Sequence, residues 1–368
     1  MLPISKSARA LSLNAALAAA VAAAVVTAWP ARAHAQTKIV EGFVSHGALQ
    51  WPEYIASEFG WFKENGVDLD MLVVGAGAAQ QVAAGALNLG YSGFPDFIRA
   101  INQGAPVKIV INAITAPPYG VYSKPAIKKI ADLKGKTVSI GGTKDVTLIY
   151  MEAFIGSAGL KASDLDFVYA KATQDRLATL LSGGVDAAIL YPPSTFRAAA
   201  AGYTYLGDIE TYLKDFPFTV WAANTDWAAK NREALLSYIR AYSRALRWLY
   251  DAKNKDQAVD ILVKYSKQDR KDSVDTYDYF VTRLHAFSAN GRISPESYKR
   301  MTDALVQWGD LSQPVPPASE VLRLELCRGC LETVIALHRH SHTSPGVLQS
   351  PRPMNADLSM TVISGFDP

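Results

Sequence analysis

Short apolar runs alternate with helix-like stretches through most of the chain after residue 36. Lys38–Val44, Val67–Val74 and Val107–Ala113 are rich in β-branched residues, which is typical of buried strands. Between such runs, segments such as Pro52–Phe62 and Thr173–Leu181 indicate helices with glycine at or near their ends. Strands that alternate with helices predict an α/β fold with largely parallel sheets.

One helix–strand–helix pattern occurs twice, as Gly85–Gly104 and Gly183–Gly202, whose starting numbers differ by 98. Because ligands bind at the carboxyl ends of strands in open α/β sheets, the repeat predicts two similar lobes whose post-strand loops face a shared cleft. The alternative is chance similarity between two ordinary strand-to-helix turns. At the fixed offset the matched pairs are Gly85 and Gly183, Asn88 and Asp186, Pro95 and Pro193, Arg99 and Arg197, and Gly104 and Gly202.

Two segments, Ala116–Lys124 and Phe216–Asn224, read as crossings between these lobes. From Thr225 to about Gly309 the pattern becomes helical, and these helices should pack back on the first lobe. We therefore expect a first lobe of residues 36–120 and 221–317 and a second lobe of residues 121–220, hinged around the cleft.

Both ends of the chain differ from this body. Residues 1–35 combine a basic start, an apolar run from Leu11 to Ala28 and the pattern Ala33-His-Ala35, which predicts a cleaved secretory signal peptide; a retained membrane anchor is the alternative. This segment holds three of the 37 basic residues and none of the 34 acidic ones, so the remainder carries 34 of each. A balanced charge gives no reason to expect a nucleic-acid partner.

The end of the chain changes composition abruptly. Residues 318–368 contain no Lys, Trp or Tyr, yet they hold both cysteines and three of the six histidines. We expect an atypical tail, foreign or frame-shifted, that is not part of the fold. Its Cys-x-x-Cys pair and histidines have zinc-ligand spacing on paper, although an exported protein could instead oxidise the pair. These residues are Cys327, Cys330, His338, His340 and His342.

Four phrases carry a resemblance to a known family: Lys38–Phe43, Glu58–Leu69, Ala84–Ser92 and Leu133–Gly141. Together and in this order they resemble the nitrate/sulfonate/taurine-type periplasmic substrate-binding proteins of ABC importers, whose superfamily includes binders of thiamine-pyrimidine precursors. The resemblance covers roughly Gln36–Pro317. It implies a type-II periplasmic-binding-protein fold that closes on a small molecule and hands it to a membrane permease.

The turn Gly141–Asp145 is the leading candidate for an anion site. It ends a strand and begins a helix, so unpaired backbone N–H groups should point into the cleft. The resemblance implies ligand contact at this turn, and we expect it from Gly142, Thr143 and Thr147. An ordinary capped helix start is the alternative.

The resemblance also implies ligand contacts after the strand of the first repeat copy. Ser92 offers a hydroxyl, Gly93 a backbone N–H and Phe94 a ring that could stack on a flat ligand or cover the core. Tyr191 takes the corresponding place in the second copy, and we expect it to contact the ligand.

Three further aromatic residues are candidates for the walls of the site. Trp51 follows the first strand, whereas Tyr119 and Trp221 fall in the two crossings. Aromatic walls are common in pockets for small molecules. Their number favours a flat or partly apolar ligand over a bare ion such as nitrate.

No catalytic or metal-binding residues stand out in the body of the chain. Residues 36–317 contain no cysteine, and His46 and His285 are their only histidines, so a catalytic triad cannot be assembled. We expect no cofactor and no enzymatic activity. The predicted function is a monomeric periplasmic binding protein that captures a small anionic or aromatic molecule (a sulfonate, a carboxylate or a pyrimidine) for an ABC importer. The alternatives are a pyrimidine-precursor-synthase-like enzyme and a ligand-sensing partner of a membrane receptor.

Overall fold

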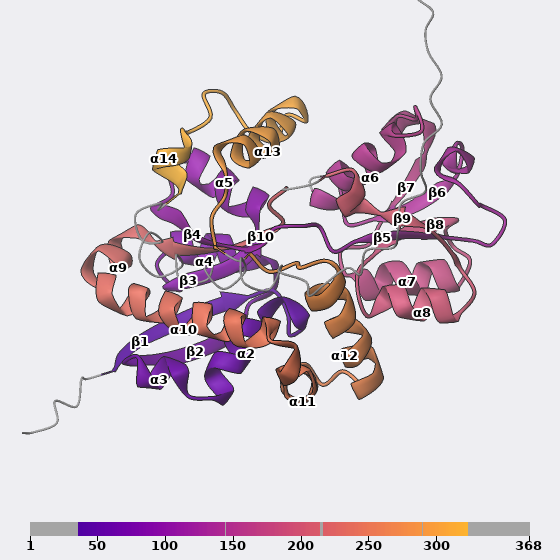
Figure 1. Ribbon diagram of the computed structural model, residues 1–368. Coiled ribbons are helices and arrows are strands. Elements are labelled where there is room, and N and C mark those ends of the chain that lie inside the picture. The colour runs from indigo at the N-terminus through magenta and orange to yellow at the C-terminus, as the bar shows by residue number, and fades with distance from the viewer. Residues whose placement is uncertain (1–35, 144, 214–215, 289, 323–368) are drawn as a thin grey trace, which may run out of the picture.

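The computed structural model describes residues 36–143, 145–213, 216–288 and 290–322, which form two lobes, each built on one five-stranded sheet (Figure 1). The predicted α/β fold with two lobes is confirmed. The strands of the first sheet are β1 (Thr37–Phe43), β2 (Val67–Val73), β3 (Leu89–Gly93), β4 (Val107–Ile114) and β10 (Thr219–Asn224), and those of the second are β5 (Gly120–Ser123), β6 (Thr137–Ile140), β7 (Asp166–Tyr169), β8 (Ala187–Leu190) and β9 (Thr204–Asp208).

The two sheets have the same topology. Their strand orders are β2-β1-β3-β10-β4 and β7-β6-β8-β5-β9. In each sheet one strand, β10 or β5, runs antiparallel to both of its neighbours, and the other paired strands are parallel. These two antiparallel strands lie within the segments predicted as crossings, Ala116–Lys124 and Phe216–Asn224.

The repeat seen in the sequence reappears as the same hydrogen bond in both lobes. Asn88 Oδ1 accepts from the backbone N of Val40 in β1 at 2.8 Å, and Asp186 Oδ2 accepts from the backbone N of Thr137 in β6 at 3.1 Å. Each side chain therefore ties the start of its own strand to the neighbouring strand. The glycines that open and close both copies have φ between 74° and 83°, which explains why the matched positions are glycine.

Helices cover both faces of each sheet (Figure 1). The predicted helix over Pro52–Phe62 is split at Gly60, whose φ of 68° cannot continue an α-helix. In the first lobe the helices before the second crossing are α2 (Trp51–Glu58), α3 (Trp61–Glu64), α4 (Ala78–Ala83) and α5 (Phe94–Asn102), and the second lobe has α6 (Val146–Gly156), α7 (Thr173–Leu181) and α8 (Ser194–Ala200).

The helical stretch predicted after the second crossing packs back on the first lobe, as expected, where α10 and α11 contact α2. It contains a π-helix, η7 (Asp278–Arg283). No helix among the described residues is long and apolar enough to cross a membrane. The α-helices of this stretch are α9 (Thr225–Lys230), α10 (Arg232–Tyr250), α11 (Lys255–Ser266), α12 (Arg270–Tyr277), α13 (Pro295–Gln307) and α14 (Ala318–Val321).

The first lobe continues past its expected end at residue 317. Val321 in α14 is fully buried, and Leu322 forms a bridge with Ile109 of β4. Residues 318–322 therefore belong to the fold, although the composition changes at residue 318. The expected signal peptide and the cysteines and histidines of the tail lie outside the described residues.

The core of the first lobe contains two buried carboxyl groups, those of Glu41 in β1 and Glu53 in α2. Trp221 Nε1 donates to Glu53 Oε1 at 2.5 Å. Burial raises the pKa of Glu53 from 4.5 to about 8, and burial together with the neighbouring Glu53 raises the pKa of Glu41 well above its usual value. The folded protein therefore binds protons here that the unfolded chain would release at neutral pH.

We expect Glu53→Gln to flatten the dependence of stability on pH. The contribution of Glu53 to stability is fully present below pH 4.5 and falls as the pH rises through about 8, a loss on the order of 5 kcal/mol. Glutamine keeps an acceptor for Trp221 but does not titrate. Thermal melts at about pH 5 and about pH 9 measure this effect. The melting temperature should fall between these two pH values in both proteins, and the fall should be several degrees smaller in the variant.

Glu296→Gln is the matched control, because Glu296 is exposed in the first turn of α13. This control should keep the original pH dependence. The same pH dependence in Glu53→Gln and Glu296→Gln would contradict the assignment of a buried, protonated Glu53.

Candidate functional site

A cavity of about 30 Å³ lies between the two lobes. The first lobe contributes Arg99 of α5 and three residues in or just after α13, and the second lobe contributes the turn between β6 and α6 together with the first turns of α6. The turn predicted as an anion site therefore lies at the junction between the lobes. The lining residues are Arg99, Thr143, Asp145, Val146, Leu148, Ile149, Leu305, Trp308 and Asp310.

The start of α6 already holds a carboxylate of the chain itself. Asp145 Oδ1 accepts from Thr147 N at 2.9 Å and from Thr147 Oγ1 at 2.6 Å, and Gly141 N donates to Thr147 Oγ1 at 2.7 Å. Thr147 is therefore engaged within the turn, and it is buried. The carbonyl of Gly142 accepts from Asp145 N. Of the three residues predicted to contact a ligand at this turn, the exposed Thr143 is the one that lines the cavity.

The contacts predicted after the strand of the first repeat copy begin inside it, because Ser92 and Gly93 are the last residues of β3, and they are held by neighbouring groups. Ser92 is 2% exposed, and its Oγ donates to Asp96 Oδ2 at 2.5 Å. Asp96 Oδ1 accepts from Arg99 Nη1 at 2.8 Å, so Ser92 is connected through two hydrogen bonds to a residue that lines the cavity. Gly93 pairs with Thr219 of β10 in the first sheet.

Three predicted aromatic contacts lie in the core of the first lobe. Trp51 donates through Nε1 to Ala258 O at 2.9 Å, and Trp221 is occupied by Glu53. Phe94 is fully buried and meets the ring of Tyr298 edge-on at 6.0 Å. These three rings fill the space between the sheet and its helices. The spacing of residues in the sequence does not distinguish a ring in the core from a ring at the cleft. The site proposed below does not include them.

Tyr119 and Tyr191, by contrast, are brought together. Their rings meet edge-on with centroids 5.4 Å apart, and Tyr119 also contacts Phe218 at 5.5 Å and Tyr150 at 5.7 Å. We call these four residues the crossing aromatics, because Tyr119 and Phe218 belong to the two crossings. The crossings are also joined to the first sheet, since Phe218 N donates to Ile114 O at 3.0 Å.

A buried arginine that the sequence analysis did not single out lies beside these rings. Arg176 in α7 is 1% exposed, and its Cζ lies 5.9 Å from the centroid of the Tyr119 ring. Burial raises the pKa of Tyr119 and of Tyr191, and the positive charge of Arg176 opposes both shifts. In the sequence, Arg176 looks like an ordinary charged residue of a helix, because nothing local shows that its side chain turns inward.

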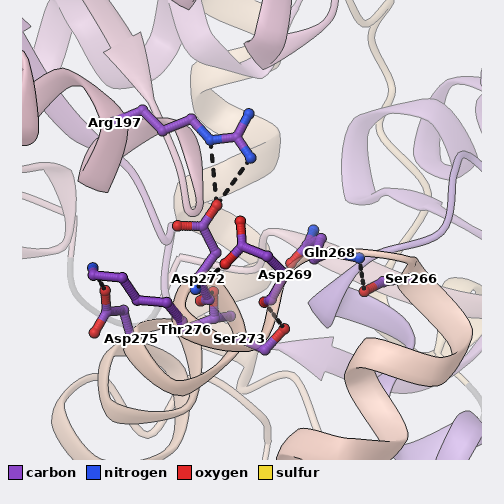
Figure 2. A network of polar contacts seen from close by, with 9 residues as sticks. Arg197, Ser266, Gln268, Asp269, Asp272, Ser273, Asp275 and Thr276 are labelled. Carbon is purple, nitrogen blue, oxygen red and sulfur yellow. Dashed lines mark hydrogen bonds and ion pairs between the residues drawn. The ribbon is translucent and has the colours of Figure 1, made fainter.

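Two ion pairs join the lobes, and Figure 2 shows the one between Arg197 and Asp272. Arg197 of α8 donates to Asp272 Oδ2 of α12 from Nη2 at 2.9 Å and from Nε at 3.2 Å. Asp208, at the end of β9, accepts from Arg283 Nη2 at 2.6 Å and from Tyr279 Oη at 3.3 Å. These contacts connect the second lobe to the C-terminal helices of the first.

The repeat partner of Arg197 makes a different contact. Arg99 Nε donates to Asp310 Oδ2 at 2.7 Å, and both residues belong to the first lobe. The repeat therefore placed an arginine at equivalent points of the two lobes: Arg99 pairs with Asp310 of its own lobe, and Arg197 pairs with Asp272 across the lobes. Within the described ranges, no group of three or more His, Cys, Asp or Glu residues could hold a metal ion.

Two curated relatives align over most of the body of this chain. The chain is 27% identical to a putative binding protein of Brucella abortus over 277 residues, 72% of this chain and 83% of the relative. It is 25% identical to the formylaminopyrimidine-binding protein of Halalkalibacterium halodurans over 221 residues, 57% of this chain and 64% of that protein.

Solved structures show the same fold. The periplasmic aliphatic sulphonate binding protein SsuA of Escherichia coli is similar with a TM-score of 0.64 and 17% identity, over 90% of this chain and 98% of SsuA. The periplasmic nitrate-binding protein NrtA of Synechocystis PCC 6803 is similar with a TM-score of 0.67 and 15% identity, over 84% and 92% of the two chains. The two lobes are therefore those of a periplasmic-binding-protein fold.

The family model described as NMT1/THI5 like matches residues 50–255, more than half of the chain, which include the whole second lobe and part of the first. The chain belongs to the NMT1/THI5-like family.

Proposed function

We propose that this protein is a periplasmic solute-binding protein that captures one small anionic or aromatic molecule between its lobes and delivers it to an ABC importer. The observation that carries the proposal is the pair of matching sheets with a cavity between their lobes, lined by the turn after β6 on one side and by Arg99 and α13 on the other. Binding rather than catalysis is supported by the relatives, which are named as binding proteins. A sulfonate, a carboxylate and a pyrimidine are the candidate ligand classes.

The proposed ligand site combines residues of the first crossing and of both lobes. Tyr119 and Tyr191 supply aromatic surface, and Thr143 supplies a hydroxyl at the interlobe cavity. Ser92 acts through Asp96 and Arg99 rather than by direct contact, because its hydroxyl is engaged. This division of roles combines aromatic surface with polar groups that can orient a ligand, as is usual in small-molecule pockets.

A ligand that binds only the folded protein raises its melting temperature by mass action. We expect at least one member of a panel of sulfonates, carboxylates, pyrimidines and nitrate to raise the melting temperature by about 5 °C or more at a concentration of roughly 100 times its Kd. Differential scanning fluorimetry measures this shift. A panel in which no compound raises the melting temperature would contradict the proposed function.

Tyr191→Ala should weaken binding of a panel compound that shifts the melting temperature. The variant removes a ring from the crossing aromatics, and we expect a loss of affinity of at least about tenfold, measured by isothermal titration calorimetry. Tyr205→Ala is the matched control, because Tyr205 lies in the same lobe on β9 and is 46% exposed. Equal affinities of the two variants would place the site away from Tyr191.

The pair of Arg197 and Asp272 should stabilise the closed arrangement of the lobes. Asp272 is largely buried and Arg197 is half exposed, so Asp272→Asn should weaken ligand binding by about twofold to fivefold. Arg197→Gln should weaken it similarly, and the double variant should cost little more than either single change. Calorimetry on all four proteins measures this coupling. Fully additive losses would show that the pair does not act as a unit.

A further inference from the structure

A buried guanidinium group lies at the carboxyl edge of the second sheet. Arg176 Nε donates to the carbonyl of Ile189 at 2.7 Å, and Nη1 donates to the carbonyls of Ala170 and Lys171 at 2.9 Å each. Ile189 belongs to β8, and the other two residues follow β7. The side chain therefore occupies the edge of the sheet at which ligands bind in open α/β folds.

The charge of Arg176 has no acidic partner among the described residues, none of which forms an ion pair with it. An arginine has five N–H groups and stays protonated in proteins. The three carbonyls use three of these groups, and the Tyr119 hydroxyl also hydrogen-bonds the side chain, but no carboxylate or carbonyl in the described ranges accepts from the two on Nη2. A buried charge is costly unless it is paired, so this group favours the arrival of an anion.

The crossing aromatics define the other side of the same position. The Arg176 guanidinium lies within 5.9 Å of the Tyr119 ring centroid, and Tyr191 is the edge-on neighbour of Tyr119. Both tyrosines are expected ligand contacts from the sequence, one in a crossing and one after the strand of the second repeat copy. A positive charge and two aromatic rings thus come together where the second lobe joins the crossings.

We infer that Arg176 determines the ligand class: the ligand is a small carboxylate or sulfonate whose oxygens accept from Arg176 Nη2, with its apolar part against Tyr119 and Tyr191. This inference rests on the proposed function and narrows it by excluding neutral pyrimidines. Hydrogen bonds between a guanidinium and an oxyanion are short and strong, and water exclusion strengthens them further. A neutral amide of the same shape offers an N–H group where an acceptor is needed and leaves the buried charge unpaired.

Matched ligand pairs test the inference on the unaltered protein. The probes are benzoate against benzamide, benzenesulfonate against benzenesulfonamide, and cytosine as the neutral pyrimidine, measured by calorimetry at neutral pH. We expect an anion to bind at least about tenfold more tightly than its neutral partner. The carboxylate and sulfonate arms show which oxyanion is preferred.

The outcomes separate this inference from the proposed function. A neutral amide or cytosine that binds as tightly as the anions overturns the role of Arg176 and leaves the binding function standing. Failure of every probe, together with a silent panel of sulfonates, carboxylates, pyrimidines and nitrate, overturns both.

Variants locate the preference at Arg176. We expect Arg176→Gln to reduce the affinity ratio of benzoate over benzamide to near one, and Arg176→Lys to keep part of it. Arg240→Gln is the matched control, because Arg240 is an arginine of the first lobe that pairs with the exposed Glu233. A purely structural role would lower the melting temperature of Arg176→Gln without changing the ratio, and that result overturns the inference. If Arg176→Gln does not fold, the ratio in the unaltered protein decides.

Discussion

The return strand β10 is the constraint on which the rest of the structure depends. It lies antiparallel between β3 and β4, so the first lobe closes its sheet only after the chain has built the second lobe. Its pairing places Trp221 in the core and Thr219 beside Gly93 at the edge of the sheet. Phe218, just before it, is hydrogen-bonded to Ile114 and to Phe94 of the first lobe, and its ring contacts Tyr119 of the other crossing. Motion of the lobes must therefore pass through these crossings.

The buried charges follow from the same arrangement. The first lobe hides Glu41 and Glu53 between its sheet and helices, where burial favours their protonated forms and Trp221 occupies one carboxyl oxygen. The second lobe hides Arg176 at its sheet edge, next to the crossing aromatics. Protonation can neutralise a carboxyl group, whereas a guanidinium stays charged and needs a partner. The acids therefore fit a structural role, and the arginine fits ligand recognition.

Local sequence patterns predicted the fold well because glycine, proline and β-branched residues act locally. The repeat, the C-terminal helices and strands β1, β2 and β4 appear where the patterns placed them, whereas β5 and β10 lie in segments that the patterns indicated only as crossings. The site was harder, because side-chain direction depends on packing between distant segments. The core contains Trp51, Trp221 and Phe94, which were expected at the cleft. Asp145 caps α6 at the position where an anion was expected. Arg176 turns inward from α7, although its sequence resembles that of an exposed helix. Tyr119 and Tyr191 came together because β5 and β8 are antiparallel neighbours, with Gly120 opposite Leu190.

The central claim is that the two lobes hold one small molecule between them. Native mass spectrometry of the protein, mixed with the sulfonates, carboxylates and pyrimidines of the panel, tests it most directly. The account predicts one retained molecule per chain, for an anion in preference to its neutral analogue, and loss of that adduct in Tyr191→Ala. A spectrum that shows no adduct with any compound, or an adduct unaffected by Tyr191→Ala, would contradict it.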